Sequence, residues 1–105
     1  MEPYGRWEQV EPGIKRKIHP PGERLMMMEV AFDTDAVGAE HSHPHEQYTY
    51  CVQGRLAFSI DGRTVYLSRG DSLHIPSGCR HGVRALEPSV LLDTFTPLRE
   101  DLLKK

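Results

Sequence analysis

The sequence has few cysteines, no basic run and no long apolar segment. Cys51 and Cys79 are too few for a disulfide framework and lack zinc-finger spacing. The formal charge is −2 and the isoelectric point is about 6.3, which argues against nucleic-acid binding through phosphate neutralisation. No stretch approaches a membrane span, and the N-terminus MEPYGRWEQV lacks the apolar core of a signal peptide. We therefore predict a cytoplasmic protein that binds neither nucleic acid nor membrane.

Helical periodicity is also scarce, and the pattern indicates an all-β protein. Glycine and proline recur roughly every 8–12 residues, the rhythm of a sandwich or barrel. The length suits one domain, residues 1–105, with a core of about residues 14–97. The last residues, REDLLKK, are predicted to form one turn or to fray. The predicted strands are IKRKI, RLMMMEVAF, QYTYCVQ, RLAFSI, RTVYL, SLHIP, GVRAL and SVLLDTF.

The segment RLAFSIDGRTVYL predicts its own register. Its Asp-Gly pair at 61–62 is a strong signal for a two-residue turn. That turn pairs Phe58 with Val65 and Leu56 with Leu67. These side chains then share one face, as a period of two requires.

Three of the six histidines stand close together in HSHPHEQ. In a strand, residues two apart point the same way, so His41 and His43 can present two imidazoles to one ion. The proline that follows bends the chain, so His45 need not stay in that line. The amide oxygen of Gln47 is a candidate third ligand. The alternative is a surface loop whose histidines bind nothing.

This segment resembles the first motif of the cupin family, G-x5-H-x-H-x3,4-E-x6-G. His41 and His43 supply the paired histidines. Gln47 occupies the glutamate position, and Gly54 closes the motif. Asp35 replaces the opening glycine, which leaves the spacing of the histidines intact.

The segment GDSLHIPSGCRHGV resembles the second cupin motif, G-x5-P-x-G-x2-H-x3-N. Ala85 stands where the motif has asparagine. Every other position is matched, by Gly70, Pro76, Gly78 and His81. Because the two motifs occur in order and strand patterns flank them, the resemblance extends over most of the chain.

The resemblance implies a single-domain cupin β-barrel (a jelly roll, or double-stranded β-helix) that holds one divalent transition metal. The candidate metals are nickel, zinc, iron, manganese and copper, and the sequence does not choose among them. The alternative pair, His43 with His45, would put Thr49, a poor ligand, in the glutamate position. The ligands that the resemblance implies are His41, His43, Gln47 and His81.

A second group of candidate functional residues lies in the segment SVLLDTFTPLRED. Leu91, Asp93 and Phe95 share one strand face. If that face is inward, Asp93 is a buried carboxylate, which needs the metal site or Arg99 as a partner. The alternative makes Leu92 the inward residue and Asp93 a solvated charge at the strand end. The pattern leaves both open.

The whole chain resembles the KdgF-type cupins of pectin and alginate degradation, through HSHPHEQ, G-D-x-x-x-I-P-x-G-x-x-H and D-x-F-x-P-x-R-E-D. Their activity is ring opening of 4,5-unsaturated monouronates to linear keto sugar acids. The resemblance implies Asp93, Phe95 and Arg99 as the functional side chains of an isomerase- or lyase-like enzyme. An arginine fork matches a sugar-acid carboxylate, Asp93 can shuttle a proton, and Phe95 can pack on the sugar ring.

Other functions stay open. A metal-dependent dioxygenase also uses a cupin with three histidines, and oxygen consumption with ferrous iron would reveal it. A non-catalytic sugar-binding module would bind without turnover. Storage or structural cupins are a further class, but they are in general longer and two-domained.

The strand QYTYCVQ has two different faces. With Gln47 inward, Cys51 also faces inward and is predicted to be a small buried hydrophobe rather than a ligand. The opposite face carries Tyr48, Tyr50 and Val52, an apolar patch if uncovered, so we predict a homodimer. The sequence assigns no role to His45 or Cys79.

Overall fold

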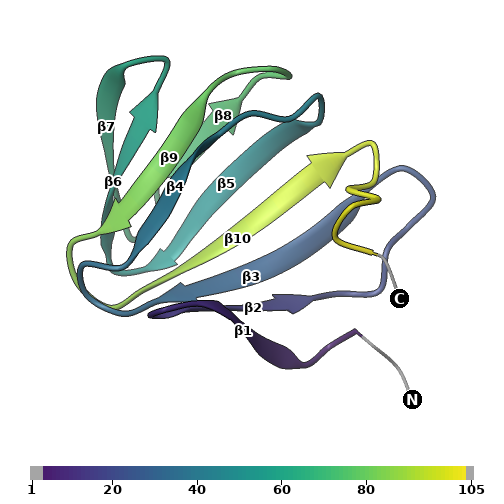
Figure 1. Ribbon diagram of the computed structural model, residues 1–105, viewed down its shortest axis with the longest axis horizontal. Coiled ribbons are helices and arrows are strands. Elements are labelled where there is room, and N and C mark those ends of the chain that lie inside the picture. The colour runs from purple at the N-terminus through teal and green to yellow at the C-terminus, as the bar shows by residue number, and fades with distance from the viewer. Residues whose placement is uncertain (1–3, 104–105) are drawn as a thin grey trace.

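The computed structural model describes residues 4–103, and its two antiparallel sheets face each other (Figure 1). One sheet has six strands in the order β1 (Trp7–Glu11), β2 (Ile14–Ile18), β3 (Met26–Phe32), β10 (Ser89–Thr96), β5 (Glu46–Gln53) and β8 (Ser72–Ile75). The other has four, in the order β4 (Val37–His41), β9 (His81–Ala85), β6 (Arg55–Ile60) and β7 (Arg63–Ser68).

The predicted all-β barrel is confirmed. No helix occurs within residues 4–103, so none there has the length and apolarity to cross a bilayer. The C-terminal tail makes the predicted turn, because the Leu102 amide donates to the Arg99 carbonyl at 2.9 Å. The last two residues of that prediction, Lys104 and Lys105, lie outside the described residues.

The core lies between the two sheets. Leu56 and Phe58 of β6 pack with Leu67 of β7 and with Leu91 of β10 from the facing sheet. A smaller cluster of Ile18, Met26 and Phe95 lies beside the C-terminal segment, which covers it with Leu98, Leu102 and Leu103. The C-terminal segment therefore packs against adjacent ends of β2, β3 and β10.

The register of the β6–β7 hairpin is confirmed at every predicted pair. Phe58 pairs with Val65 and Leu56 with Leu67. Asp61 and Gly62 have φ angles of +46° and +82°, the left-handed conformations that a type I′ turn requires. Glycine adopts this conformation without strain, so the local sequence sets this hairpin.

Two strands were absent from the sequence prediction. All five residues of β1 are exposed, so this strand shows no apolar alternation. In β4, Gly38 and Ala39 have low strand propensity. Both segments form strands because they pair with the edge of a neighbouring strand. β1 pairs with β2, and β4 pairs with β9.

Candidate metal centre and pocket

Strand register gathers the predicted ligands at one end of the barrel. His41, the last residue of β4, pairs with His81, the first residue of β9. Gln47, near the start of β5, pairs with Phe95, near the end of β10. Because neighbouring strands are antiparallel, residues far apart in sequence meet at this end.

His43 reaches the cluster from a loop. The strand alternation expected for His41 and His43 is wrong, because β4 ends at His41. Instead, the loop is fixed to the turn that precedes β9. The amide of Gly78 donates to the His43 carbonyl at 2.8 Å, and the Ser77 hydroxyl donates to the Pro44 carbonyl at 2.6 Å.

The three imidazoles direct the same nitrogen toward a shared point. In His41, His43 and His81, Nδ1 lies 3.0, 3.0 and 2.9 Å from a main-chain carbonyl two residues away. A carbonyl only accepts, so Nδ1 carries the hydrogen and Nε2 keeps its lone pair. Metal-binding histidines are oriented in this way. Among the described residues, these rings form a group whose ligand nitrogens lie within 4.8 Å of one another.

Gln47 adds an oxygen to this group. Its Oε1 lies 3.1 Å from His43 Nε2, and its amide Nε2 donates to Thr49 Oγ1 at 2.8 Å. Two lone pairs thus face each other, an arrangement that a cation between them relieves. Two ligands about 2.1 Å from one ion and at right angles are about 3.0 Å apart. The donor set therefore fits a transition metal.

Electrostatics favour the neutral form of two histidines in the cluster. Burial lowers the pKa of His43 and of His81, and the nearby charge of Arg99 lowers both further. A neutral imidazole is the form that binds a metal.

Asp93 faces inward, so the inward alternative is correct and Leu92 is not the core residue. Leu91, Asp93 and Phe95 are 2%, 7% and 1% exposed. The hydrogen bond of the Asp93 carboxylate is to a third residue, with the candidate ligand Gln47 and the charge of Arg99 close by. Thr49 Oγ1 donates to Asp93 Oδ1 at 2.8 Å. Burial raises the pKa of Asp93 to about 6, although this hydrogen bond acts in the opposite direction.

Arg99 pairs with Asp101 rather than with Asp93. Its Nε and Nη2 donate to the two carboxylate oxygens of Asp101 at 3.1 and 2.8 Å. The guanidinium carbon lies 5.1 Å from the centre of the Phe95 ring. The pair with Asp101 uses two of the five N–H groups of the guanidinium, so three remain to bind a ligand.

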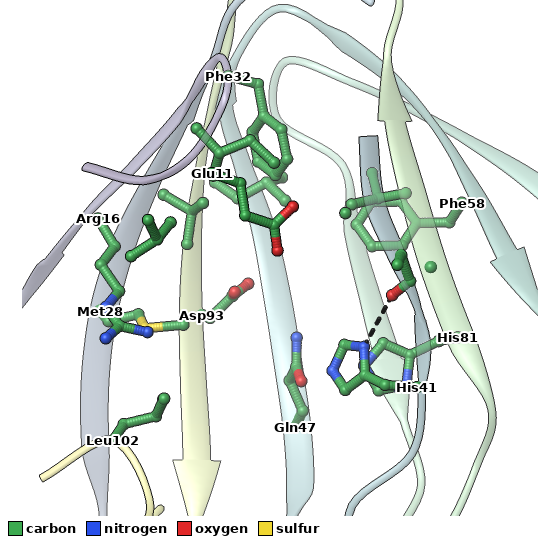
Figure 2. A pocket seen from close by; sticks show the side chains of 18 of the residues that line it. Glu11, Arg16, Met28, Phe32, His41, Gln47, Phe58, His81, Asp93 and Leu102 are labelled. Carbon is green, nitrogen blue, oxygen red and sulfur yellow. Dashed lines mark hydrogen bonds between the residues drawn. The ribbon is translucent and has the colours of Figure 1, made fainter. Parts of the chain in front are cut away.

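A pocket of about 400 Å³ lies between the sheets, with the candidate metal centre on its wall. Figure 2 shows His41 and His81 on one side, Asp93 in the middle and Arg16 on the far side. Glu11 also points into this space from the end of β1 (Figure 2). The pocket therefore carries polar groups at both ends.

Sequence reasoning missed Arg16. Its side chain is 25% exposed, and its Nε donates to Glu8 at 3.0 Å. The available signal was the alternation of IKRKI, because Ile14 and Ile18 are buried and Arg16 shares their face.

Comparisons with known proteins identify the family of this chain. Residues 28–95 match the cupin domain family. The chain belongs to the cupin family. This cupin is 41% identical over 99 residues to the pectin degradation protein KdgF of Dickeya dadantii (strain 3937), a match that covers 92% of this chain and 90% of the relative.

Two solved structures extend the comparison. KdgF from Halomonas sp. is 43% identical to this cupin, with a TM-score of 0.89 over 93% of this chain and 91% of the other. An RmlC-like cupin from Shewanella frigidimarina NCIMB 400 is 33% identical, with a TM-score of 0.88 over 97% and 96%. The resemblance to KdgF-type cupins, predicted from the motifs, is confirmed.

Both cysteines and His45 lie outside the candidate metal group. Cys51 and Cys79 are buried free thiols, as expected for Cys51, and burial raises the pKa of each. His45 is half-buried and its Nδ1 has no hydrogen-bond partner among the described residues. Its ring centre lies 5.5 Å from that of His43.

Proposed function

We propose that this cupin is a metal-dependent enzyme that opens the ring of 4,5-unsaturated monouronates to give linear keto sugar acids. The observation that carries the proposal is one pocket that joins a three-histidine, one-glutamine donor set to a buried carboxylate. The similarity to two proteins named KdgF, one of them a pectin degradation protein, supports this class of substrate.

One divalent transition metal is held by His41, His43, Gln47 and His81. When bound, the metal supplies Lewis acidity toward a substrate oxygen. All four side chains are neutral ligands, so they leave the charge of the ion uncompensated. A carboxylate ligand in the place of Gln47 would weaken that acidity.

Asp93 carries the proton. Ring opening moves one proton from the anomeric hydroxyl to the ring carbon at the far end of the double bond. The bond between the anomeric carbon and the ring oxygen breaks, and the ring oxygen becomes the new ketone oxygen. No oxidant is required. Asp93 is the buried carboxylate in this pocket, and it accepts the proton and returns it.

The remaining polar groups bind the substrate. The free N–H groups of Arg99 bind the substrate carboxylate, and Phe95 packs against the sugar ring beside them. Arg16 binds oxygen atoms at the end of the substrate remote from the histidines. Glu11 accepts hydrogen bonds from sugar hydroxyls. Both line the same pocket.

The protein also forms a homodimer through the outer face of β5. Tyr48, Tyr50 and Val52 on this face are 54%, 45% and 42% exposed. A cluster of large apolar side chains on a sheet face favours burial against a second copy.

The test is a rate assay on a 4,5-unsaturated monouronate. The expected result is loss of the substrate's ultraviolet absorbance, faster than the uncatalysed loss and without oxygen uptake. Addition of a chelator slows the reaction, and added metal restores it. Oxygen uptake would favour the dioxygenase alternative. Tight binding without turnover would favour the sugar-binding module.

A further inference from the structure

Two successive hydrogen bonds connect Gln47 to Asp93 through Thr49, and in both the donor is on the side of Gln47. Gln47 Nε2 donates to Thr49 Oγ1 at 2.8 Å, and Thr49 Oγ1 donates to Asp93 Oδ1 at 2.8 Å. Thr49 is fully buried and faces Asp93 across the β5–β10 pair. A threonine hydroxyl has one hydrogen, and this one is given to Asp93, so Thr49 can only accept from its other neighbour.

We propose that Thr49 is a positioning residue that makes the amide at position 47 and the carboxylate at position 93 depend on each other. The inference rests on the proposed roles of Gln47 as a metal ligand and Asp93 as the proton carrier. Thr49 accepts from the amide nitrogen, so the amide oxygen is turned toward His43, 3.1 Å from its Nε2. A flipped amide would lose the bond to Thr49.

This dependence gives a physical reason for glutamine at the position where the cupin motif has glutamate. With a glutamate at position 47, the single hydrogen of Thr49 would lie between two buried carboxylates. One of them would then lose its hydrogen bond, and a buried acceptor without a donor is destabilising. The glutamine and Asp93 are thus connected through the hydroxyl of Thr49, and the residue type that suits one position depends on the residue at the other.

The first experiment measures zinc and nickel binding to metal-free protein by titration calorimetry. Thr49→Val keeps the shape and the strand propensity but removes the hydroxyl. We expect its affinity for each metal to fall by about 10–100-fold, the usual effect of losing a group that orients a ligand. Thr49→Ser restores the hydroxyl and most of the affinity.

The matched control is Thr94→Val, the same chemical change on the outer face of β10. It leaves metal affinity unchanged. If Thr49→Val binds metal as tightly as the parent protein, Thr49 is an ordinary buried strand residue and the inference is wrong. If the parent protein itself binds no metal, the proposed function fails instead.

The second experiment needs neither metal nor substrate. It compares the Tm of metal-free Gln47→Glu, Asp93→Asn and the double variant at about pH 8, where carboxylates are ordinarily ionised. We expect Gln47→Glu to lower the Tm by roughly 4–8 °C. Adding Asp93→Asn supplies an N–H donor to Thr49, which then donates to the new carboxylate, so most of the Tm returns. An equal loss with and without Asp93→Asn would overturn the inference.

Discussion

β5 and the β6–β7 hairpin bury opposite kinds of side chain. On β5, the inward residues Gln47 and Thr49 are polar, and the outward residues Tyr48 and Tyr50 are aromatic and about half exposed. A half-buried strand ordinarily has the reverse arrangement, with apolar residues inside.

The hairpin follows the ordinary arrangement. Leu56, Phe58 and Leu67 point into the core, and the outward face carries Thr64 and Tyr66. Its turn and its alternation are both local signals. The hairpin therefore contributes mainly to folding. β5 instead has polar residues on its inner face and exposed apolar residues on its outer face.

The largest expected effect comes from the inner face beside β5. Asp93→Asn should retain the fold and the metal but lower turnover by roughly 10²–10⁴-fold, because an amide cannot accept the proton. The measurement is the ultraviolet assay at saturating substrate, with metal content determined on the same sample. Asp61→Asn, in the exposed hairpin turn, is the matched control and should keep full turnover. Equal turnover in the parent and Asp93→Asn would remove Asp93 from the mechanism.

Substitutions in the core of the hairpin should lower the stability of the protein rather than its turnover. Leu56 is fully buried, so Leu56→Ala should lower the free energy of unfolding by roughly 2–5 kcal/mol. Urea titration at a temperature where the variant is folded measures this change. Tyr66→Ala, on the outer face of the same hairpin, should change stability by about 0.5 kcal/mol or less. Similar losses in both variants would contradict the core assignment.

An intermediate effect concerns the two arginines of the pocket. Arg99→Lys should lower kcat/KM by roughly 10–100-fold, because a single ammonium does not reproduce the guanidinium fork. Arg16→Gln should mainly raise KM, by a smaller factor of roughly 2–10. Lys15→Gln, exposed on the same strand as Arg16, is the control and should leave KM unchanged. A larger effect at Arg16 than at Arg99 would reverse their roles.

The smallest effect on turnover is expected from the outer face of β5. Tyr48→Ser with Tyr50→Ser should convert the proposed dimer into a monomer, close in mass to the 12.0 kDa of the parent chain, as measured by light scattering and without loss of metal. A parent protein that is already monomeric at working concentration would contradict the contribution of this face.

The same contrast explains what the sequence could predict. The hairpin register follows from Asp61-Gly62 and a period of two, and both are local. The histidine spacing and its family resemblance predicted which rings would meet. The route of His43 through a loop was not predictable, because it depends on hydrogen bonds from Ser77 and Gly78.

The partner of Asp93 was also hidden from the sequence. Thr49 and Asp93 are 44 residues apart and meet only through the β5–β10 register. Arg16 was overlooked for another reason, because a charged residue between two isoleucines resembles an exposed strand position until its neighbours are known to be buried.

The central claim is that the inner end of β5 forms one wall of a metal centre built from His41, His43, Gln47 and His81. Elemental analysis of purified parent, His43→Ala, His81→Ala and His45→Ala proteins tests it most directly. We expect about one transition-metal ion per chain in the parent, almost none in His43→Ala or His81→Ala, and most of the metal in His45→Ala. Equal loss in all three variants, or a parent protein that holds no metal when supplied with it, would contradict the account.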